Sequence, residues 1–70
     1  MKTLEGEHMN RLKELRAQSN LTQKAVANAV GITTSYYGMI ELGVRKPSLS
    51  LAMDLARFFD TSVEDIFFDL

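Results

Sequence analysis

Several features are missing from this 70-residue sequence, and each absence excludes a class of protein. There is no cysteine, which excludes disulfide bonds and thiolate metal sites and fits a reducing cytosol. No apolar run approaches the ~18 residues that a membrane span needs, and no signal-peptide pattern opens the chain. We therefore expect a cytoplasmic protein without a membrane partner. The single histidine, His8, has no cysteine with which to share a metal ion, so no metal or cofactor is expected.

The chain is long enough for one domain and too short for a catalytic domain together with a regulatory one. A domain of this size buries only roughly 60% of its unfolded surface. The apolar fraction of 46% and the charged fraction of 24% indicate a globular chain rather than a disordered one. Residues 1–8 show no periodicity and are expected to be a leader or extension. Residues 9–70 are then the single domain.

The charged residues are distributed unevenly along the chain, although the net charge is only −1. Residues 9–46 carry six bases against two acids, a net charge of +4. Residues 47–70 carry one base against five acids, a net charge of −4. This asymmetry indicates one face for a polyanion and another turned away from it, while a chance division in a short chain is the alternative.

Apolar spacing, polar caps and glycines divide the chain into five short helices and predict an all-α fold. The first helix is expected from Met9 to Gln18, because Met9, Leu12 and Leu15 share one helix face. Each later helix follows a hydroxyl residue suited to cap it, and two of these helices end at a glycine. The expected caps are Thr22, Thr33, Ser48 and Ser62, the glycines are Gly31 and Gly43, and these helices extend to about Val30, Leu42, Phe59 and Ile66. Residues 67–70 could add a short terminal strand.

The stretch from Leu21 to Gly43 has the pattern of a helix-turn-helix, two capped helices joined by a short turn that contains a glycine. In such a unit the second helix enters the DNA major groove while the first crosses the backbone. Many small helical bundles contain a similar turn, so the pattern alone is a weak indication.

The chain from Leu12 to Ile66 resembles the repressor/Cro-type (XRE-like) helix-turn-helix family of bacteria and their phages. The resemblance implies a compact five-helix, lambda-repressor-like domain whose second and third helices form the helix-turn-helix. The matching residues, in order and without a shift in spacing, are Leu15-Arg16, Leu21-Thr22-Gln23, Ala27, Gly31-Ile32, Ser35-Tyr36, Ile40-Glu41, Gly43, Pro47-Ser48, Leu55-Ala56 and Ser62 to Phe67.

The resemblance also implies a role for individual residues. Arg16 and Glu41 match a partly buried ion pair that joins the first helix to the third. The residues expected to read DNA bases are Thr33, Thr34, Ser35, Gly38 and Met39. The residues expected to contact the DNA backbone are Gln23, Tyr36, Arg45 and Lys46, and Lys24 is added because it lies at the positive end of a helix, a natural phosphate site. Each of these charged side chains could equally be a solvated surface group.

The expected recognition helix departs from the family pattern, because residues 33–43 contain no Arg, Lys, Gln or Asn. Those side chains make the bidentate contacts to guanine or adenine. Thr and Met can pack on thymine methyl groups, and Gly38 would let the backbone approach closely. The alternative is a domain that no longer binds DNA.

Self-association is a further expectation. Five apolar residues have no obvious inward place, and a soluble monomer rarely exposes such a patch. They are Leu51, Phe58, Phe67, Phe68 and Leu70, and we expect them to form a homodimer interface. The alternative is that Phe67, with one other residue, tucks under the first helix.

The sequence therefore predicts a transcriptional regulator that binds specific double-stranded DNA, a repressor acting as a homodimer. One alternative is an antitoxin or immunity-type regulator that works with an unknown protein partner. Another is a helix-turn-helix fold used only for protein–protein contact. No enzyme is expected, because there is no Gly-rich phosphate loop and no catalytic or metal-ligand constellation.

Overall fold

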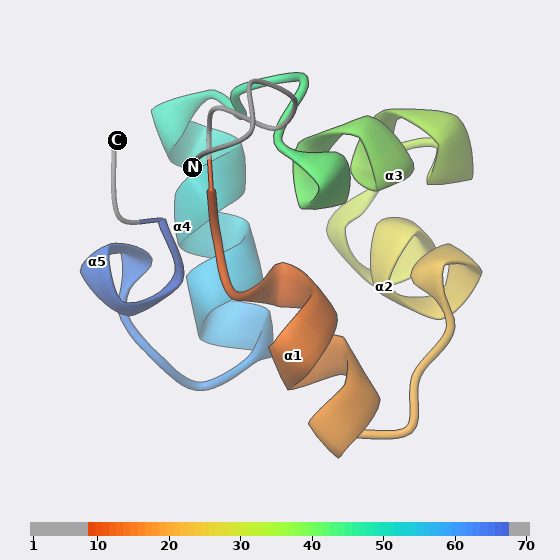
Figure 1. Ribbon diagram of the computed structural model, residues 1–70, viewed down its shortest axis with the longest axis horizontal. Helices are drawn as coiled ribbons and strands as arrows, with labels where there is room; N and C mark the ends of the chain where they lie inside the picture. Colours follow the sequence, from red (N-terminus) through yellow and green to blue (C-terminus); the bar gives the residue numbers. More distant parts are fainter. Residues whose placement is uncertain (1–8, 68–70) are drawn as a thin grey trace, which may run out of the picture.

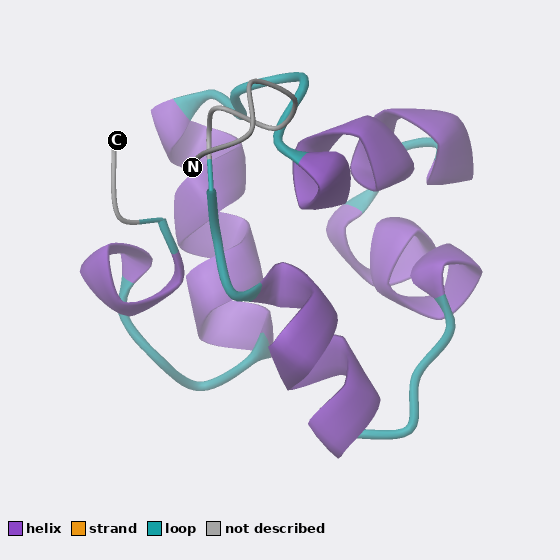
Figure 2. Cartoon of the chain, in the orientation of Figure 1, coloured by secondary structure: helices purple, strands orange, loops and turns teal. Residues whose placement is uncertain are grey.

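The computed structural model describes residues 9–67 and contains five helices in that range. They are α1 (Leu12–Gln18), α2 (Gln23–Val30), α3 (Thr34–Leu42), α4 (Leu49–Phe58) and α5 (Val63–Ile66). Helices α2 and α3 lie on one side of the molecule, and α4 and α5 lie on the other (Figure 1). Within residues 9–67 the chain is helix and loop alone, apart from one antiparallel bridge between Asn10 and Phe67 (Figure 2). The fold is the five-helix, lambda-repressor-like arrangement that the sequence predicts.

The helix boundaries follow from local side-chain and backbone chemistry. The hydroxyl of Thr22 accepts a hydrogen bond from the amide of Ala25 at 3.0 Å, which satisfies a free donor at the start of α2. The three other predicted caps act in the same way, and they are Thr33, Ser48 and Ser62. Helices α2 and α3 end at Gly31 and Gly43, whose φ angles of 77° and 86° suit glycine far better than other residues.

Helix α1 begins at Leu12, so the expected start at Met9 is wrong. The side-chain oxygen of Asn10 accepts a hydrogen bond from the Leu12 amide at 3.0 Å, and this Asx turn leads into the helix, whose N-cap residue is Arg11. The Asn10 amide group donates to the carbonyl of Ile40 at 2.9 Å and so joins this segment to α3. Met9 is consequently exposed rather than part of an inward helix face.

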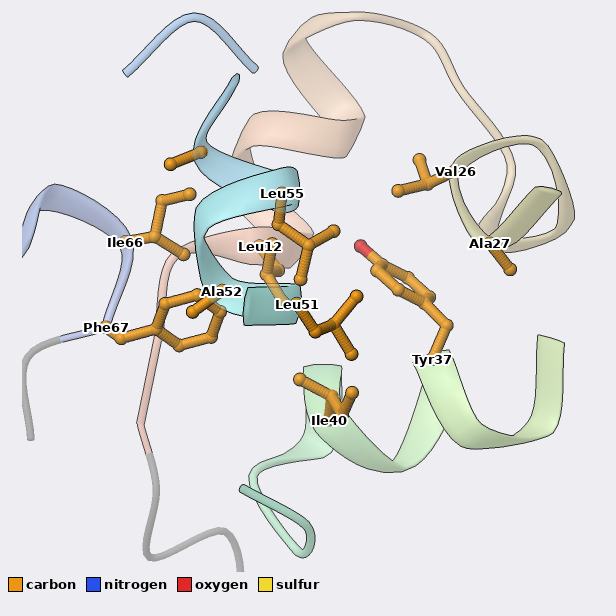
Figure 3. Close-up of a cluster of buried hydrophobic side chains, with 11 residues drawn as sticks. Leu12, Val26, Ala27, Tyr37, Ile40, Leu51, Ala52, Leu55, Ile66 and Phe67 are labelled. Atoms are coloured by element: carbon orange, nitrogen blue, oxygen red, sulfur yellow. The ribbon is translucent and has the colours of Figure 1, made fainter. Parts of the chain in front are cut away.

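One apolar core joins all five helices. Tyr37 of α3 is its largest fully buried side chain, and Val26 of α2 and Leu55 of α4 belong to the same cluster (Figure 3). Leu12 and Ile66 bring α1 and α5 to the same cluster, and all five of these side chains are fully buried. No helix within residues 9–67 has the length and hydropathy that crossing a membrane would require.

Two residues assigned to the dimer interface belong to this core, so their assignment is wrong. Leu51 faces the cluster from the first turn of α4 and is 8% exposed, and Phe67 is 4% exposed. Phe67 reaches the core because its backbone pairs with Asn10, which draws the residue after α5 back over the domain. Neither side chain has surface to offer to a second subunit. Phe58 remains exposed, while the leader (residues 1–8), Phe68 and Leu70 lie outside the described residues.

Replacing Gly38 tests how much this glycine destabilises helix α3. It lies in the helix interior with ordinary helical backbone, where glycine costs about 1 kcal/mol relative to alanine. A Cβ added there would meet only the Gln23 amide, at the ordinary contact distance of 3.7 Å. Gly38→Ala should therefore raise the free energy of unfolding by roughly 0.5–1 kcal/mol, measured by urea denaturation. Gly31→Ala is the opposite control, because its positive φ should make alanine destabilising.

Candidate nucleic-acid interface

Helices α2 and α3 meet through a short turn that is fixed at both ends. After α2, the amide of Ile32 donates to the carbonyl of Ala27 at 3.0 Å, while Gly31 takes the left-handed conformation. Ile32 packs against the core, and Thr33 then caps α3. The turn therefore holds α3 at a fixed angle to α2, which is the geometry of a helix-turn-helix.

The proposed base-reading residues lie along one end and one side of α3. Thr33, Thr34 and Ser35 are exposed at its N-terminal end, while Gly38 and Met39 are half-buried. The Thr33 oxygen accepts a hydrogen bond from the amide of Tyr36 at 3.1 Å, so its hydroxyl hydrogen is left to donate. The surface of α3 thus presents small hydroxyl groups with one flexible thioether beside them.

The loop after α3 brings two of the expected backbone residues together. The Arg45 guanidinium lies over the ring of Tyr36, 5.8 Å from its centroid, in a cation–π contact. The Arg45 amide also donates to the carbonyl of Met39, which fixes the loop to the end of α3. Lys46 follows directly and is exposed, as is Lys24 in the first turn of α2.

Ion pairing separates the basic residues into two groups. Arg11, Arg16 and Arg57 each pair with a carboxylate. Among residues 9–67, four basic residues take part in no salt bridge, and these are Lys13, Lys24, Arg45 and Lys46. Three of these four basic residues belong to the helix-turn-helix and the loop that follows it. Positive charge is therefore left uncompensated beside α3.

The predicted ion pair between α1 and α3 is present. Arg16 donates from Nε to Glu41 Oε2 at 2.7 Å and from Nη2 to Glu41 Oε1 at 3.0 Å, a bidentate arrangement. Its third donor, Nη1, reaches the carbonyl of Leu21 at 3.0 Å. The Glu41 side chain is 5% exposed and that of Arg16 is 19% exposed, so the pair is largely shielded from water.

Two further side chains donate to the same carboxylate. The Tyr37 hydroxyl donates to Glu41 Oε2 at 2.9 Å, and the Gln23 amide donates to Glu41 Oε1 at 2.8 Å. The sequence reasoning missed both contacts. The four-residue spacing of Tyr37 and Glu41 along one helix was a usable signal for the first. The second joins residues 18 apart, and nothing local indicates it.

The pKa of Glu41 depends on two opposing effects, burial of its carboxyl group and the hydrogen bonds that the carboxylate accepts. Burial alone would raise the pKa of this carboxyl, but hydrogen bonds from Arg16, Gln23 and Tyr37 outweigh burial and lower it below its usual value. Burial, together with the hydrogen bond to Glu41, raises the pKa of Tyr37. At neutral pH the site therefore holds an ionised carboxylate and a protonated tyrosine that donates to it.

The lowered pKa predicts how stability depends on pH. A carboxyl whose pKa is lower in the folded state stabilises the fold fully above its unfolded pKa, here about 4.5. This contribution is lost as the pH falls through the folded value. The difference in unfolding free energy between the unmodified protein and Glu41→Gln should thus stay constant from pH 7 to about 5 and shrink at lower pH. Urea denaturation across this range measures it, and a difference that does not change with pH would contradict the assignment.

The fold and this surface define a helix-turn-helix DNA-binding protein. The family model described as Helix-turn-helix (HTH_3) matches residues 12–66. The chain therefore belongs to the helix-turn-helix family, and its type is that of the repressor/Cro (XRE-like) regulators. It is a transcriptional regulator with a helix-turn-helix DNA-binding domain.

Individual relatives and solved structures agree with this family. The uncharacterized HTH-type transcriptional regulator MJ0272 of Methanocaldococcus jannaschii is 45% identical over 58 residues, which cover 83% of this chain and 88% of MJ0272. The restriction-modification controller protein C.AhdI from Aeromonas hydrophila is similar in structure, with a TM-score of 0.72, 36% identity, and coverage of 79% of this chain and 83% of C.AhdI. The biofilm regulator SinR, solved in complex with DNA, has a TM-score of 0.70 and 25% identity, over 77% of this chain and 87% of SinR.

Proposed function

We propose that this protein is a transcriptional repressor that binds a specific double-stranded DNA sequence as a homodimer. The observation that carries the proposal is a group of exposed basic side chains without a salt bridge in the helix-turn-helix and the loop after it, namely Lys24, Arg45 and Lys46. Exposed cations of this kind neutralise DNA phosphates and supply affinity without reading sequence. SinR, a similar structure, was solved with DNA bound.

Base reading in this proposal depends on two kinds of contact. Thr34 and Ser35 lie exposed at the start of α3, where hydroxyl groups make single hydrogen bonds to most bases. The Thr methyl group and the Met39 side chain suit thymine methyl groups. We therefore expect an operator whose half-sites contain A·T pairs at the positions that α3 faces.

The test is a mobility shift with DNA selected from random sequences, repeated over a series of salt concentrations. A protein that neutralises phosphates loses affinity linearly on a log–log plot of binding constant against salt. Selection of one recurring sequence with such a slope would support the proposal. A flat salt response and no selected sequence would overturn it and favour a fold used only for protein contact.

The homodimer part of the proposal rests on α4. Within residues 9–67, three of the exposed large apolar side chains belong to this helix: Leu49, Met53 and Phe58. Phe58 is 39% exposed and packs edge to face on Phe59, with the ring centroids 4.9 Å apart. Aromatic residues are enriched at interface centres, and α4 belongs to the acidic half of the sequence rather than to the basic, DNA-reading half. The same surface thus need not serve both DNA and a second subunit.

Replacing both Phe58 and Phe68 by serine should give a folded monomer with much weaker affinity for a two-half-site operator. A dimer engages both half-sites at once, whereas a monomer engages one. Sedimentation equilibrium measures the first effect and a mobility shift the second. Leu42→Ser is the matched control, since Leu42 is 71% exposed on α3 and its replacement should leave the dimer intact. An unmodified protein that is monomeric at high micromolar concentration would contradict the proposal.

A further inference from the structure

We infer that Glu41 is a positioning residue for DNA binding, which orients the Gln23 amide so that its remaining N–H donates to a DNA phosphate. The inference rests on the proposed function, because it concerns how the same surface contacts DNA. It adds a role for a residue that otherwise belongs to an ion pair beneath that surface.

The carboxylate of Glu41 is a fixed acceptor. Its Oε2 receives Arg16 Nε at 2.7 Å and the Tyr37 hydroxyl at 2.9 Å, and its Oε1 receives Arg16 Nη2 at 3.0 Å. Contacts from two helices therefore hold both oxygens. The remaining donor to Oε1 is Gln23 Nε2, at 2.8 Å, from the first residue of α2.

This contact decides which way round the Gln23 amide lies. An ionised carboxylate only accepts hydrogen bonds, so the nitrogen of the amide, and not its oxygen, must face Glu41. The nitrogen has two hydrogens, and Glu41 takes one. Gln23 is half-buried in the first turn of α2, and we assign its second amide hydrogen to a phosphate, which also only accepts hydrogen bonds. Without Glu41, the Gln23 side chain would have to give up its rotamer freedom as well as select one amide orientation when it binds the phosphate, and this ordering would weaken binding.

The Gln23 amide also lies against the backbone of the recognition helix at Gly38. A Cβ built on Gly38 would lie 3.7 Å from Gln23 Oε1 and 3.8 Å from Nε2, so the amide lies beside α3 at this residue. The charge of Glu41 does not oppose a nearby phosphate strongly, because the bidentate Arg16 guanidinium balances it. The Gln23 amide thereby connects the shielded Arg16–Glu41 ion pair, whose charges balance, to the surface proposed to contact DNA.

The test separates positioning from folding by replacing the buried pair with apolar residues. Such replacements are often neutral for stability, whereas removing one partner is not. The variant combines Arg16→Met, Tyr37→Phe and Glu41→Leu, so that no buried hydroxyl is left without its acceptor. If Glu41 positions Gln23, this variant should bind operator DNA about tenfold more weakly while staying folded by circular dichroism.

A double-mutant cycle with Gln23→Ala completes the test. In the unmodified background Gln23→Ala should weaken binding about tenfold, and in the triple variant it should have no further effect. Tyr37→Phe alone is the matched control, because it removes one donor to Glu41 and leaves the Gln23 contact, so its affinity should stay within about twofold. If the triple variant is unfolded at the measuring temperature, Glu41→Gln replaces it in the same cycle.

The outcomes distinguish this inference from the proposed function. Additive losses, or a triple variant with unchanged affinity, would overturn the positioning role while DNA binding stands. If the unmodified protein shows no salt-dependent binding to DNA, the proposed function itself is overturned. Neutral methylphosphonate groups placed one at a time in the operator should reveal a phosphate whose replacement weakens the unmodified protein about tenfold but hardly affects Gln23→Ala.

Discussion

Replacing Glu41 by alanine should lower the free energy of unfolding by about 3 kcal/mol. The alanine leaves the Arg16 side chain, which is only 19% exposed, without its bidentate partner. It also removes the acceptor for the hydroxyl of Tyr37, a fully buried residue. A small domain has a total stability of roughly 5–15 kcal/mol, so this single change should remove a large part of it. The midpoint of urea denaturation at constant m-value measures the loss.

Two control variants should lose less stability than Glu41→Ala. Tyr37→Phe should cost only about 1 kcal/mol, because it removes one hydrogen bond and leaves the ion pair intact. Arg57→Ala should cost less still, since Arg57 and its partner Asp54 are both well exposed on α4. A Glu41→Ala protein as stable as Arg57→Ala would show that the ion pair contributes nothing to the fold.

Replacing both Arg45 and Lys46 by alanine should weaken DNA binding about a hundredfold at low salt and reduce the salt slope by about two. Both side chains are exposed, and no salt bridge within residues 9–67 involves either, so each is available to one phosphate. Stability should hardly change, because the loss within the fold is confined to the Arg45 contact over Tyr36. A mobility shift with the selected operator at several salt concentrations measures affinity and slope together.

The matched control for this pair is Arg57→Ala, which also removes an exposed positive charge but from the acidic half of the chain. Its salt slope should equal that of the unmodified protein. An unchanged slope in the Arg45 and Lys46 variant would show that this loop does not contact the DNA backbone. Equal losses from both variants would instead indicate an unspecific effect of net charge.

Local chemistry made most of the fold predictable. The start of α2 depends on Thr22 and its end on Gly31, and both signals act within a few residues of the helix terminus. The predicted helix bounds of α3 and α5 agree with the structure for the same reason. The Arg16–Glu41 pair was predicted in another way, from the family resemblance, because its members are 25 residues apart.

The failures occurred where distant contacts override local pattern. Met9 has the spacing of an inward helix residue, but Asn10 forms a turn with Leu12 and pairs with Phe67 at the opposite end of the chain. Leu51 and Phe67 appeared surplus because the helical stripes of the sequence do not show how α5 and the following residue fold back. The Gln23 contact with Glu41 was missed for the same reason, since it depends on how α2 crosses α3.

The sharing of one carboxylate by α1, α2 and α3 also limits the order in which this sequence can evolve. Loss of either Arg16 or Glu41 leaves a shielded charge without a partner, so an exchange of both passes through an intermediate weakened by about 3 kcal/mol. Such an intermediate survives only after stability has been gained elsewhere, for example at Gly38. Gln23 contributes a single hydrogen bond to the cluster and can vary first. Replacements at the start of α2 are therefore accessible in one step, whereas the Arg16–Glu41 ion pair must be replaced as a unit.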